Sequence, residues 1–402
     1  MKALLPLRRG RTRPRVLTIF GSRPEATKMA PVLQALAGER QLESRVCVTA
    51  QHREMLDQVL RFHGIVPDHD LDLMRPRQSL TYLTAAAVTA LAPVLEAEQP
   101  DLVLVHGDTL TTFVGTYSAF LHRLPVGHVE AGLRSHALYS PFPEEGTRRL
   151  TDAIATLHFA PTAWARENLL REGLDADRVF VTGNTAVDAY LAVVRAEHAF
   201  ADPLVAAAFA AGRPVIAVEV HRRENWGARM RQVLLGLRDA LEARPEALAV
   251  FSVHPNPVVA EAVRESLDGC AQVVRVGPQP YVEWANAMAR AAVVLSDSGG
   301  IQEEAPSVGV RVLLARTETE RPEGVKAGTV VLVGVERARV RDALLAELDG
   351  VRAPRAGLRP NPFGDGRAAA RIAAIVRYAF GLDARPPASF APPLETEEGQ
   401  GA

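Results

Sequence analysis

Short apolar runs alternate with longer amphipathic stretches along most of the chain. The apolar runs are rich in β-branched residues and show no polar alternation, a pattern typical of parallel strands that are covered on both faces. Helical periodicity fills the intervals, for example at Pro24–Leu36, at Ser79–Ala97 and at Gly366–Phe380. We predict strands at Val16–Phe20, Val46–Thr49, Leu102–His106, Val126–Val129, Leu157–Ala160, Val179–Thr182, Val215–Val220, Leu248–His254, Val273–Val276, Val293–Ser296, Val310–Ala315 and Val330–Val333.

This alternation predicts an α/β fold class, with two doubly wound parallel-sheet (Rossmann-like) domains facing a cleft. In open sheets of this kind, ligands bind at the edge formed by the carboxyl ends of the strands. The predicted parts are a basic tail at residues 1–14, an N-terminal domain at 15–185, a C-terminal domain at 186–365, a terminal helix packing on either domain at 366–383 and a disordered tail at 384–402.

Composition narrows the class of protein. With 402 residues the chain can form two cores, and a content of 48% hydrophobic but only 5% aromatic residues suits α/β layers. The formal net charge of −1 predicts no broad basic surface for nucleic acid. Cys47 and Cys270 lie in apolar segments without close spacing, which indicates buried free thiols and a reducing, cytoplasmic location. No apolar run approaches the ~18–20 residues of a membrane helix, so we expect no membrane partner.

Two carboxylates stand at neighbouring strand ends. Asp108 follows the strand Leu102–His106 across Gly107, and Glu130 ends the strand that begins at Val126. Adjacent parallel strands would bring both carboxylates to one edge, an arrangement that suits acid–base chemistry. Each residue could instead be a helix N-cap or a member of a loop ion pair.

A third acidic position and several basic ones complete the candidates. Glu144 precedes a predicted helix, where it could also simply complement the helix dipole. Arg23 lies in the turn before the first helix, and Lys28 follows on that helix, where a solvated lysine is common. His221-Arg-Arg-Glu224 follows an apolar strand, and Arg321 ends a polar loop. Arginine suits phosphate oxygens because its planar fork can bind two of them.

One turn has the character of a phosphate seat. Val293–Ser296 is a predicted strand, and Ser298, Gly299 and Gly300 form a turn before the next helix. Small residues let the backbone approach a ligand closely, and a helix start offers N–H groups to an anion. Glu304 on that helix could hold both hydroxyls of a ribose, or be an ordinary solvated glutamate.

We predict neither a metal nor a cofactor. The histidines show no paired ligand spacing, and the chain has no Gly-x-x-x-x-Gly-Lys-Ser/Thr phosphate loop. Gly364-Asp-Gly-Arg-Ala-Ala369 fits a dinucleotide fingerprint on paper, but no strand precedes it.

Taken together, these motifs identify a family. From about Val16 to Leu382 the chain resembles the non-hydrolysing UDP-N-acetylglucosamine 2-epimerases of bacteria. The motifs that carry the resemblance are Gly21-Ser-Arg-Pro-Glu-Ala, Thr49-Ala-Gln-His-Arg-Glu-Met-Leu-Asp-Gln58, Val105-His-Gly-Asp-Thr109, His128-Val-Glu-Ala-Gly-Leu-Arg134, Pro141-Phe-Pro-Glu-Glu145, Thr182-Gly-Asn-Thr185, His221-Arg-Arg-Glu-Asn225, Ser298-Gly-Gly-Ile-Gln-Glu-Glu304 and Glu320-Arg-Pro-Glu323.

The resemblance implies a two-domain fold like the GT-B glycosyltransferases, a cytoplasmic homodimer, UDP-GlcNAc as substrate, UDP-ManNAc as product and a role in cell-surface polymer synthesis. It implies that UDP is held by Arg23, His221, Ser298, Gly299, Gly300, Glu304 and Arg321. It places Lys28, Asp108, Glu130, Glu144 and His221 around the reacting atoms. A second UDP-GlcNAc, as activator, would contact Gln51, Glu54, Arg77, Glu144, Arg222 and His254.

Elimination is the chemistry that these residues suit. UDP leaves C1 as the C2 proton is lost, which gives 2-acetamidoglucal, and both groups then re-add with the opposite configuration at C2. Asp108 or Glu130 would be the base, with Glu144 and His221 assisting. Three alternatives remain open: a hydrolysing epimerase that releases ManNAc and UDP, a GT-B glycosyltransferase, and a catalytically silent UDP-sugar sensor.

Four residues depart from the pattern of the family. Leu110 replaces a threonine, Thr147 an asparagine, and Ala137 stands where aspartate or asparagine is frequent. Glu219 stands where a threonine is usual, two residues before His221, and its negative charge would oppose a nearby pyrophosphate unless it points away from the ligand.

Overall fold

The described residues divide into two compact units. The computed structural model describes residues 3–50, 53–73, 75, 78–350 and 360–392, with the backbone alone at residues 53–55. Unit 1 comprises Met1–Ala189 and Phe363–Ala391, and unit 2 comprises Tyr190–Pro362. The boundary falls inside one helix, because Ala189 and Tyr190 both belong to α7 (Thr185–Val193).

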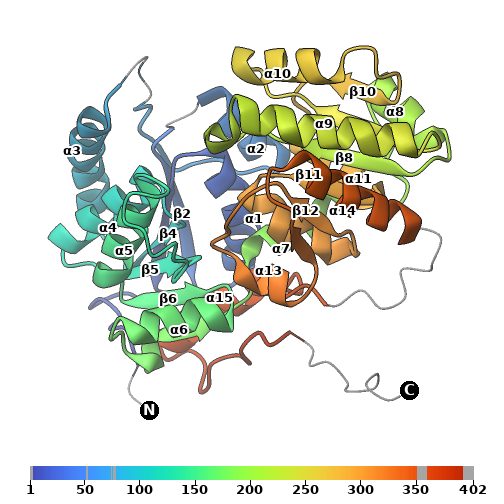
Figure 1. Cartoon of the computed structure of the whole chain (residues 1–402). Helices are drawn as coiled ribbons and strands as arrows, with labels where there is room; N and C mark the ends of the chain where they lie inside the picture. The colour runs from blue at the N-terminus through green and yellow to red at the C-terminus, as the bar shows by residue number, and fades with distance from the viewer. Residues whose placement is uncertain (1–2, 51–52, 74, 76–77, 351–359, 393–402) are drawn as a thin grey trace, which may run out of the picture. The chain divides into compact units, whose positions relative to one another are not determined.

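Unit 1 is built on a parallel sheet with the strand order β3-β2-β1-β4-β5-β6-β7 among the described residues (Figure 1). Its strands are β1 (Arg15–Phe20), β2 (Glu43–Val48), β3 (His69–Asp70), β4 (Leu102–His106), β5 (Val126–Val129), β6 (Leu157–Ala160) and β7 (Val179–Val181). Its helices are α1 (Arg23–Gly38), α2 (Arg53–Phe62), α3 (Leu80–Glu98), α4 (Leu110–Leu121), α5 (Glu144–Ile154), α6 (Ala163–Arg171), the 3-10 turn η1 (Ala176–Arg178), most of α7 and α15 (Ala368–Ala379).

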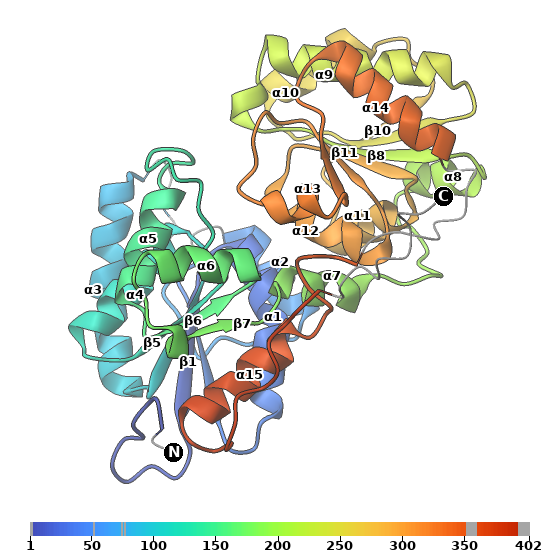
Figure 2. The same ribbon diagram turned by 60° about the horizontal axis from the view of Figure 1, so that its bottom comes forward.

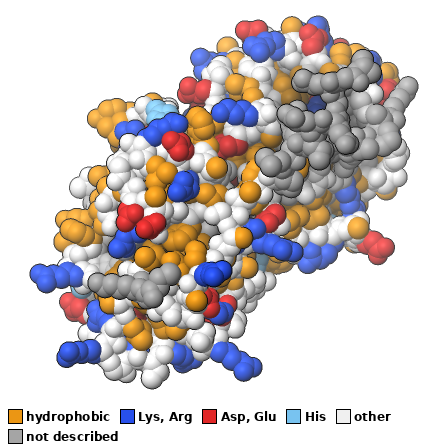
Figure 3. Space-filling model, turned by 90° about the horizontal axis from the view of Figure 1, so that it is seen from below, with side chains coloured by type: hydrophobic (Ala, Val, Ile, Leu, Met, Phe, Trp, Pro, Cys, Tyr) orange, Lys and Arg blue, Asp and Glu red, His pale blue; other side chains and the backbone are white. Residues whose placement is uncertain are grey.

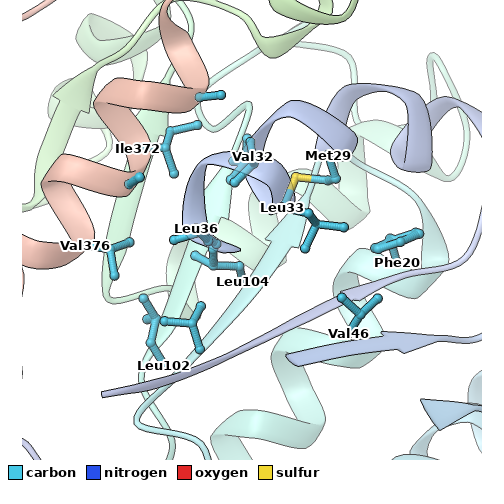
Figure 4. Close-up of a cluster of buried hydrophobic side chains, with 14 of the residues drawn as sticks. Phe20, Met29, Val32, Leu33, Leu36, Val46, Leu102, Leu104, Ile372 and Val376 are labelled. Carbon is cyan, nitrogen blue, oxygen red and sulfur yellow. The ribbon is translucent and has the colours of Figure 1, made fainter. Parts of the chain in front are cut away.

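Alternate residues of β1 enter different cores. Val16 and Phe20 pack among α1, α2 and α15, while Leu17 and Ile19 pack among α3 and α4. Figure 4 shows Ile372 and Val376 of α15 beside the side chains of α1. Both faces of the sheet are therefore covered, which explains why its strands are apolar throughout.

Unit 2 repeats this plan with a parallel sheet of order β10-β9-β8-β11-β12-β13 among the described residues (Figure 2). Its strands are β8 (Val215–Glu219), β9 (Leu248–Ser252), β10 (Val273–Val276), β11 (Val293–Ser296), β12 (Val312–Leu314) and β13 (Val330–Leu332). Its helices are α8 (Pro203–Ala210), η2 (Arg223–Asn225), α9 (Ala228–Ala243), α10 (Pro257–Leu267), α11 (Tyr281–Arg290), α12 (Gly299–Glu304), η3 (Ala305–Val308), α13 (Pro322–Lys326) and α14 (Arg337–Gly350).

The predicted fold class, two parallel-sheet α/β domains, is confirmed. Each predicted strand exists, with ends shifted by at most a few residues. The two-residue β3 was not predicted because it is too short to produce a hydrophobic pattern. The sequence did not predict on which domain the terminal helix packs. In the structure this helix, α15, belongs to unit 1.

Both predicted tails are partly ordered. Leu5 is buried and its N–H donates to the carbonyl of Ala379, and Arg11 pairs with the buried Asp101 at 2.8 Å. At the other end Phe390 is buried and its N–H donates to Val181. Parts of the segments predicted as a basic tail at 1–14 and a disordered tail at 384–402 therefore pack against partners that lie far away in the sequence. Residues 393–402 lie outside the described part.

One helix contradicts the expectation that no apolar run reaches membrane length. α3 is long and apolar enough to span a membrane by composition, and 28% of its apolar window is buried in the protein. Its buried residues include Leu91, which belongs to a unit 1 core, so this helix has a role in a folded domain.

Figure 3 shows basic, acidic and hydrophobic side chains interspersed on one face of the molecule.

Candidate active site

The unit 1 sheet edge holds the two predicted carboxylates. β4 and β5 pair directly, with His106 opposite Val129, so Asp108 and Glu130 follow neighbouring strand ends. Gly107 and Glu130 both have positive φ, 70° and 68°. A positive φ is uncommon for a residue other than glycine, and at Glu130 it turns the chain abruptly at the end of the strand.

Glu130 is the centre of a polar cluster. Lys28 Nζ lies 2.5 Å from Glu130 Oε2, and the side-chain amide of Asn184 donates to the same oxygen at 3.0 Å. The side chains of Lys28 and Glu130 are only 13% and 7% exposed. A carboxylate and an ammonium group so shielded from water interact more strongly than a surface pair. The sequence did not predict Asn184, which comes from the turn after β7.

His106, the last residue of β4, borders this cluster. Its Nε2 lies 3.8 Å from Glu130 Oε2, and among the described residues neither ring nitrogen has a hydrogen-bond partner. Burial lowers the pKa of His106 to about 4; the charge of Glu130 opposes this shift and that of Lys28 adds to it. The ring is therefore neutral near neutral pH. His106 belongs to the motif Val105-His-Gly-Asp-Thr109, but the sequence did not predict a role for its side chain.

Asp108 is bound to α5. Its carboxylate pairs with Arg148, and the Thr147 hydroxyl donates to the backbone carbonyl of Asp108. The same hydroxyl lies 2.9 Å from the carbonyl of Glu144 and shares its one hydrogen between the two oxygens, so the first turn of α5 lies against the β4 turn. Thr147, a departure from the family pattern, thus connects Asp108 and Glu144 through the backbone. Asp108 is 28% exposed and remains accessible to a ligand.

A buried network fixes the β4 and β5 turns behind these carboxylates. His128 in β5 places Nδ1 2.6 Å from Asp152 and Nε2 2.7 Å from the carbonyl of Gly107. Arg134 pairs with Asp152 at 2.8 Å. Burial alone would raise the pKa of Asp152, but the charges of His128 and Arg134 outweigh it and hold the pKa well below the usual range. No local pattern in the sequence predicts that Asp152, in α5, supports this edge.

The first loop of unit 1 is connected to the same edge by Glu25. Its carboxylate accepts the N–H of Ser22 at 2.8 Å, and Ser22 in turn caps α1. Thr109 donates to the other carboxylate oxygen at 2.9 Å. This capping box orients α1, and with it Lys28. Arg23, the first residue of α1, is exposed.

In unit 2 the loop after β8 is held by one buried carboxylate. Asp297 accepts the backbone N–H groups of His221 and Arg222 at 3.1 and 2.9 Å and the side-chain amide of Asn225 at 2.9 Å. These bonds fix the direction in which His221 and Arg222 leave the sheet edge. Sequence analysis assigned no function to Asp297 or Asn225, because both act by supporting other residues.

Two arginines lie over the glycine turn. A Cβ added at Gly299 would lie 3.0 Å from Arg321 Nη1 and 3.4 Å from Arg222 Nη2. Arg321 is oriented by Glu303, which lies 2.6 Å away, and by the adjacent Glu320. Gly299 therefore makes room for two guanidinium groups beside Ser298 and Gly300.

The remaining unit 2 candidates lie at the same sheet edge. The His221 and His254 rings stack with centroids 5.2 Å apart, and Glu219 Oε1 lies 3.6 Å from His221 Nδ1. Glu219 thus points toward His221. Glu304 accepts a hydrogen bond from the Tyr281 hydroxyl at 3.2 Å, which orients its carboxylate.

Some sequence candidates cannot be placed. Gln51 and Arg77 lie outside the described residues, and Glu54 belongs to α2 without a described side chain. Leu110 begins α4 and packs against a unit 1 core. Ala137 accepts the N–H of Ser140 in the loop before α5. Within the described ranges, no group of three His, Cys, Asp or Glu residues could hold a metal ion.

A family model and individual relatives both match this chain. The family model described as UDP-N-acetylglucosamine 2-epimerase matches residues 34–377. The chain belongs to the UDP-N-acetylglucosamine 2-epimerase family. Enzymes of this family are isomerases.

Individual relatives cover nearly the whole chain. The UDP-N-acetylglucosamine 2-epimerase of Yersinia pestis is 48% identical over 372 residues, 89% of this chain and 97% of the relative. The crystal structure of UDP-GlcNAc 2-epimerase from Neisseria meningitidis bound to UDP-GlcNAc has a TM-score of 0.81 and 43% identity, covering 90% of this chain and 99% of the other. The Methanocaldococcus jannaschii UDP-GlcNAc 2-epimerase in complex with UDP-GlcNAc and UDP has a TM-score of 0.75 and 32% identity, with 90% and 99% covered.

Proposed function

We propose that this protein interconverts UDP-GlcNAc and UDP-ManNAc by elimination and re-addition of UDP. The observation that carries the proposal is the position of Asp108 and Glu130 at the ends of paired strands β4 and β5, each beside a cation. UDP-GlcNAc and UDP are the ligands of the related epimerases from N. meningitidis and M. jannaschii, which supports the choice of substrate.

The proposed reaction balances without a cofactor. A carboxylate takes the C2 proton, the C2–H electron pair forms the C1–C2 double bond of 2-acetamidoglucal, and the C1–O bond breaks with its electrons leaving on UDP. For re-addition, UDP attacks C1 and a proton is delivered to the other face of C2. The base is Asp108 or Glu130, and Glu144 assists from the start of α5.

In unit 1, hydrogen-bond donors and cations lie beside the two carboxylates proposed for this proton transfer. Lys28 and Asn184 both face one oxygen of Glu130, and Arg148 pairs with Asp108. These donors stabilise the ionised carboxylates and orient them.

Unit 2 supplies the groups that bind the leaving UDP. Arg222 and Arg321, over Gly299, suit the two negative phosphates. Ser298 and Gly300 complete this seat, and Glu304 takes the ribose hydroxyls. His221 adds a further hydrogen-bonding group from the loop after β8. Stabilising the departing pyrophosphate lowers the barrier to C1–O cleavage.

Proton NMR of the protein with UDP-GlcNAc in D2O tests the proposal. We expect UDP-ManNAc signals to grow while both epimers lose their C2 proton. Free ManNAc with UDP would instead establish the hydrolysing reaction. Binding of UDP-GlcNAc with an unchanged spectrum would leave the glycosyltransferase or sensor function.

We also propose that a second UDP-GlcNAc activates the enzyme. Of the residues assigned to it, Glu144, Arg222 and His254 are described; Glu144 begins α5 in unit 1, whereas Arg222 and His254 follow β8 and β9 in unit 2. A sigmoidal dependence of rate on UDP-GlcNAc concentration, which His254→Ala makes hyperbolic, would support this. A hyperbolic dependence in the unaltered protein contradicts it.

The protein is further proposed to be a homodimer through unit 1. Helix α4 packs against α3 and α5 (Figure 1). All three helices expose large apolar side chains. These exposed residues are Leu80, Tyr82, Tyr117, Phe120, Leu121 and Leu150. A monomeric protein rarely leaves such a row uncovered. Sedimentation of the chain and of its Phe120→Glu variant should give a dimer and a monomer; a monomeric unaltered chain would contradict the assignment.

A further inference from the structure

Protonation of both stacked rings, those of His221 and His254, would be electrostatically unfavourable. Their centroids lie 5.2 Å apart with an interplanar angle of 21°. Two imidazolium ions at that separation repel each other, so protonation of one ring disfavours protonation of the other. The surroundings of the two rings decide which of them takes the proton.

Nδ1 of His254 is engaged as a hydrogen-bond acceptor. It accepts a hydrogen bond from the Asn256 backbone N–H at 3.1 Å. A ring nitrogen that accepts a hydrogen bond carries no proton, so the N–H of this ring is at Nε2 and Nδ1 is not offered to a ligand. Protonation of Nδ1 would break the bond to Asn256.

His221 has the opposite surroundings. Its Nδ1 faces Glu219 Oε1 at 3.6 Å, and the carboxylate of Asp297 lies at its backbone N–H, 3.1 Å away. Burial is the largest cause that lowers the pKa of His221; Asp297 raises it, and His254 and Arg222 lower it. The net effect lowers the pKa of His221, and the charge of a nearby anion would oppose that effect.

We propose that Glu219 is a positioning residue that turns Nδ1 of His221 toward its carboxylate, leaves Nε2 for the pyrophosphate of UDP, and makes His221 the ring that takes up a proton when UDP binds. The inference rests on the proposed function, because it takes UDP as the ligand. The proton comes from solvent and stays on the imidazole, between one carboxylate and the incoming phosphates.

This role explains how Glu219 can lie near the pyrophosphate of UDP although both are negatively charged. Alone, the Glu219 charge would repel UDP, but a His221 cation between the two anions attracts both. The pair then adds a charged donor to the arginine seat only when a ligand is present. In a relative with threonine at this position, the histidine would lack that carboxylate.

Calorimetry of UDP binding near neutral pH, in two buffers of different ionisation enthalpy, measures the proton uptake directly. The variants are Glu219→Gln, Glu219→Thr and His221→Asn, with Glu261→Gln on α10 as a matched control that removes an exposed carboxylate of the same unit. UDP itself exchanges protons with solvent, so the uptake assigned to His221 is the difference from His221→Asn.

We expect this difference to be positive for the unaltered protein and for Glu261→Gln, and to fall at least twofold in both Glu219 variants. Equal uptake in the unaltered protein and the Glu219 variants overturns the inference while leaving the proposed function intact. Absence of UDP binding in the unaltered protein overturns both. Uptake that persists in His221→Asn assigns the proton to another group and also overturns the inference.

A second readout separates positioning from simple structural support. In the Glu219 variants the alkaline limb of the pH profile of kcat should move to lower pH by about 0.5–1 unit, because His221 loses an opposite charge. A structural defect would lower kcat at every pH without moving that limb, and this result would contradict the inference.

Discussion

The strand-end edges of the two units carry opposite chemistry on the same architecture. In unit 1 the edge presents carboxylates, Asp108 and Glu130, each paired with a cation from a neighbouring helix. In unit 2 it presents arginines, Arg222 and Arg321, of which Arg321 is oriented by buried carboxylates behind it. The same parallel-sheet plan therefore carries paired carboxylates at the strand ends of unit 1 and arginines at the corresponding edge of unit 2.

The largest effect should follow from removing the unit 1 carboxylates. Glu130→Gln keeps the size of the side chain and can still accept from Lys28, yet it cannot take a proton. We expect kcat to fall about 10²–10⁴-fold, as for loss of an acid–base group, in this variant and in Asp108→Asn. UDP affinity, measured by calorimetry, should change little.

Near-normal turnover in both variants would remove these residues as catalysts. A matched control is Glu172→Gln, since Glu172 pairs with Arg134 in the same unit but is half-exposed and lies behind the edge. It should retain most of the activity. A large loss of UDP affinity in Glu130→Gln would contradict the division between the two edges.

A smaller effect is expected for the pH dependence of stability, in which His106 of unit 1 should differ from His221 of unit 2. His106 is buried and neutral with a pKa of about 4, so its contribution to stability is fully present above the unfolded pKa of ~6.5 and is lost as pH falls toward 4. Comparison with His106→Asn, which does not titrate there, isolates this contribution. The difference in unfolding free energy should change by about 2 kcal/mol between about pH 7 and about pH 5.

Urea unfolding at the two pH values measures this change. If the difference in unfolding free energy between the unaltered protein and His106→Asn were the same at both pH values, His106 would have an ordinary pKa. The claim that its ring beside Glu130 stays neutral would then be wrong. The unit 2 ring should behave differently, because His221 is predicted to gain its proton with UDP.

The smallest effect concerns the glycine under the unit 2 arginines. Gly299→Ala places a Cβ 3.0 Å from Arg321 Nη1, so the guanidinium must move by a few tenths of an ångström. We expect UDP affinity to fall about tenfold, the loss of roughly one well-placed hydrogen bond, with little change in proton transfer. Gly277→Ala, whose Cβ meets nothing within 4 Å, is the control.

Calorimetric titration of UDP into both glycine variants makes the comparison. Equal affinities would show that the arginines over Gly299 do not bind the nucleotide in the way we propose.

The sequence predicted most of the fold because parallel strands that are buried on both faces leave an unmistakable apolar pattern. It also predicted that Asp108 and Glu130 share an edge, since adjacent strands place their ends together. It could not predict that Lys28 and Asn184 meet at one oxygen of Glu130, because these contacts join distant segments through tertiary packing.

Supporting residues were missed for a related reason. Asp152 and Asp297 act by binding backbone groups and other side chains, so nothing local in the sequence distinguishes them from ordinary aspartates. The ordered part of the amino-terminal segment was missed because its partners, Asp101 and Ala379, are far away along the chain.

Positional isotope exchange tests the elimination most directly. UDP-GlcNAc labelled with heavy oxygen in the bond between C1 and the phosphate is incubated with the protein, and phosphorus NMR follows the label. If UDP leaves C1 during each turnover, the label should scramble into the non-bridging positions of that phosphate while UDP-ManNAc forms, and Glu130→Gln should show neither process. Formation of UDP-ManNAc with the label fixed in the bridging position would contradict C1–O cleavage and the account built on it.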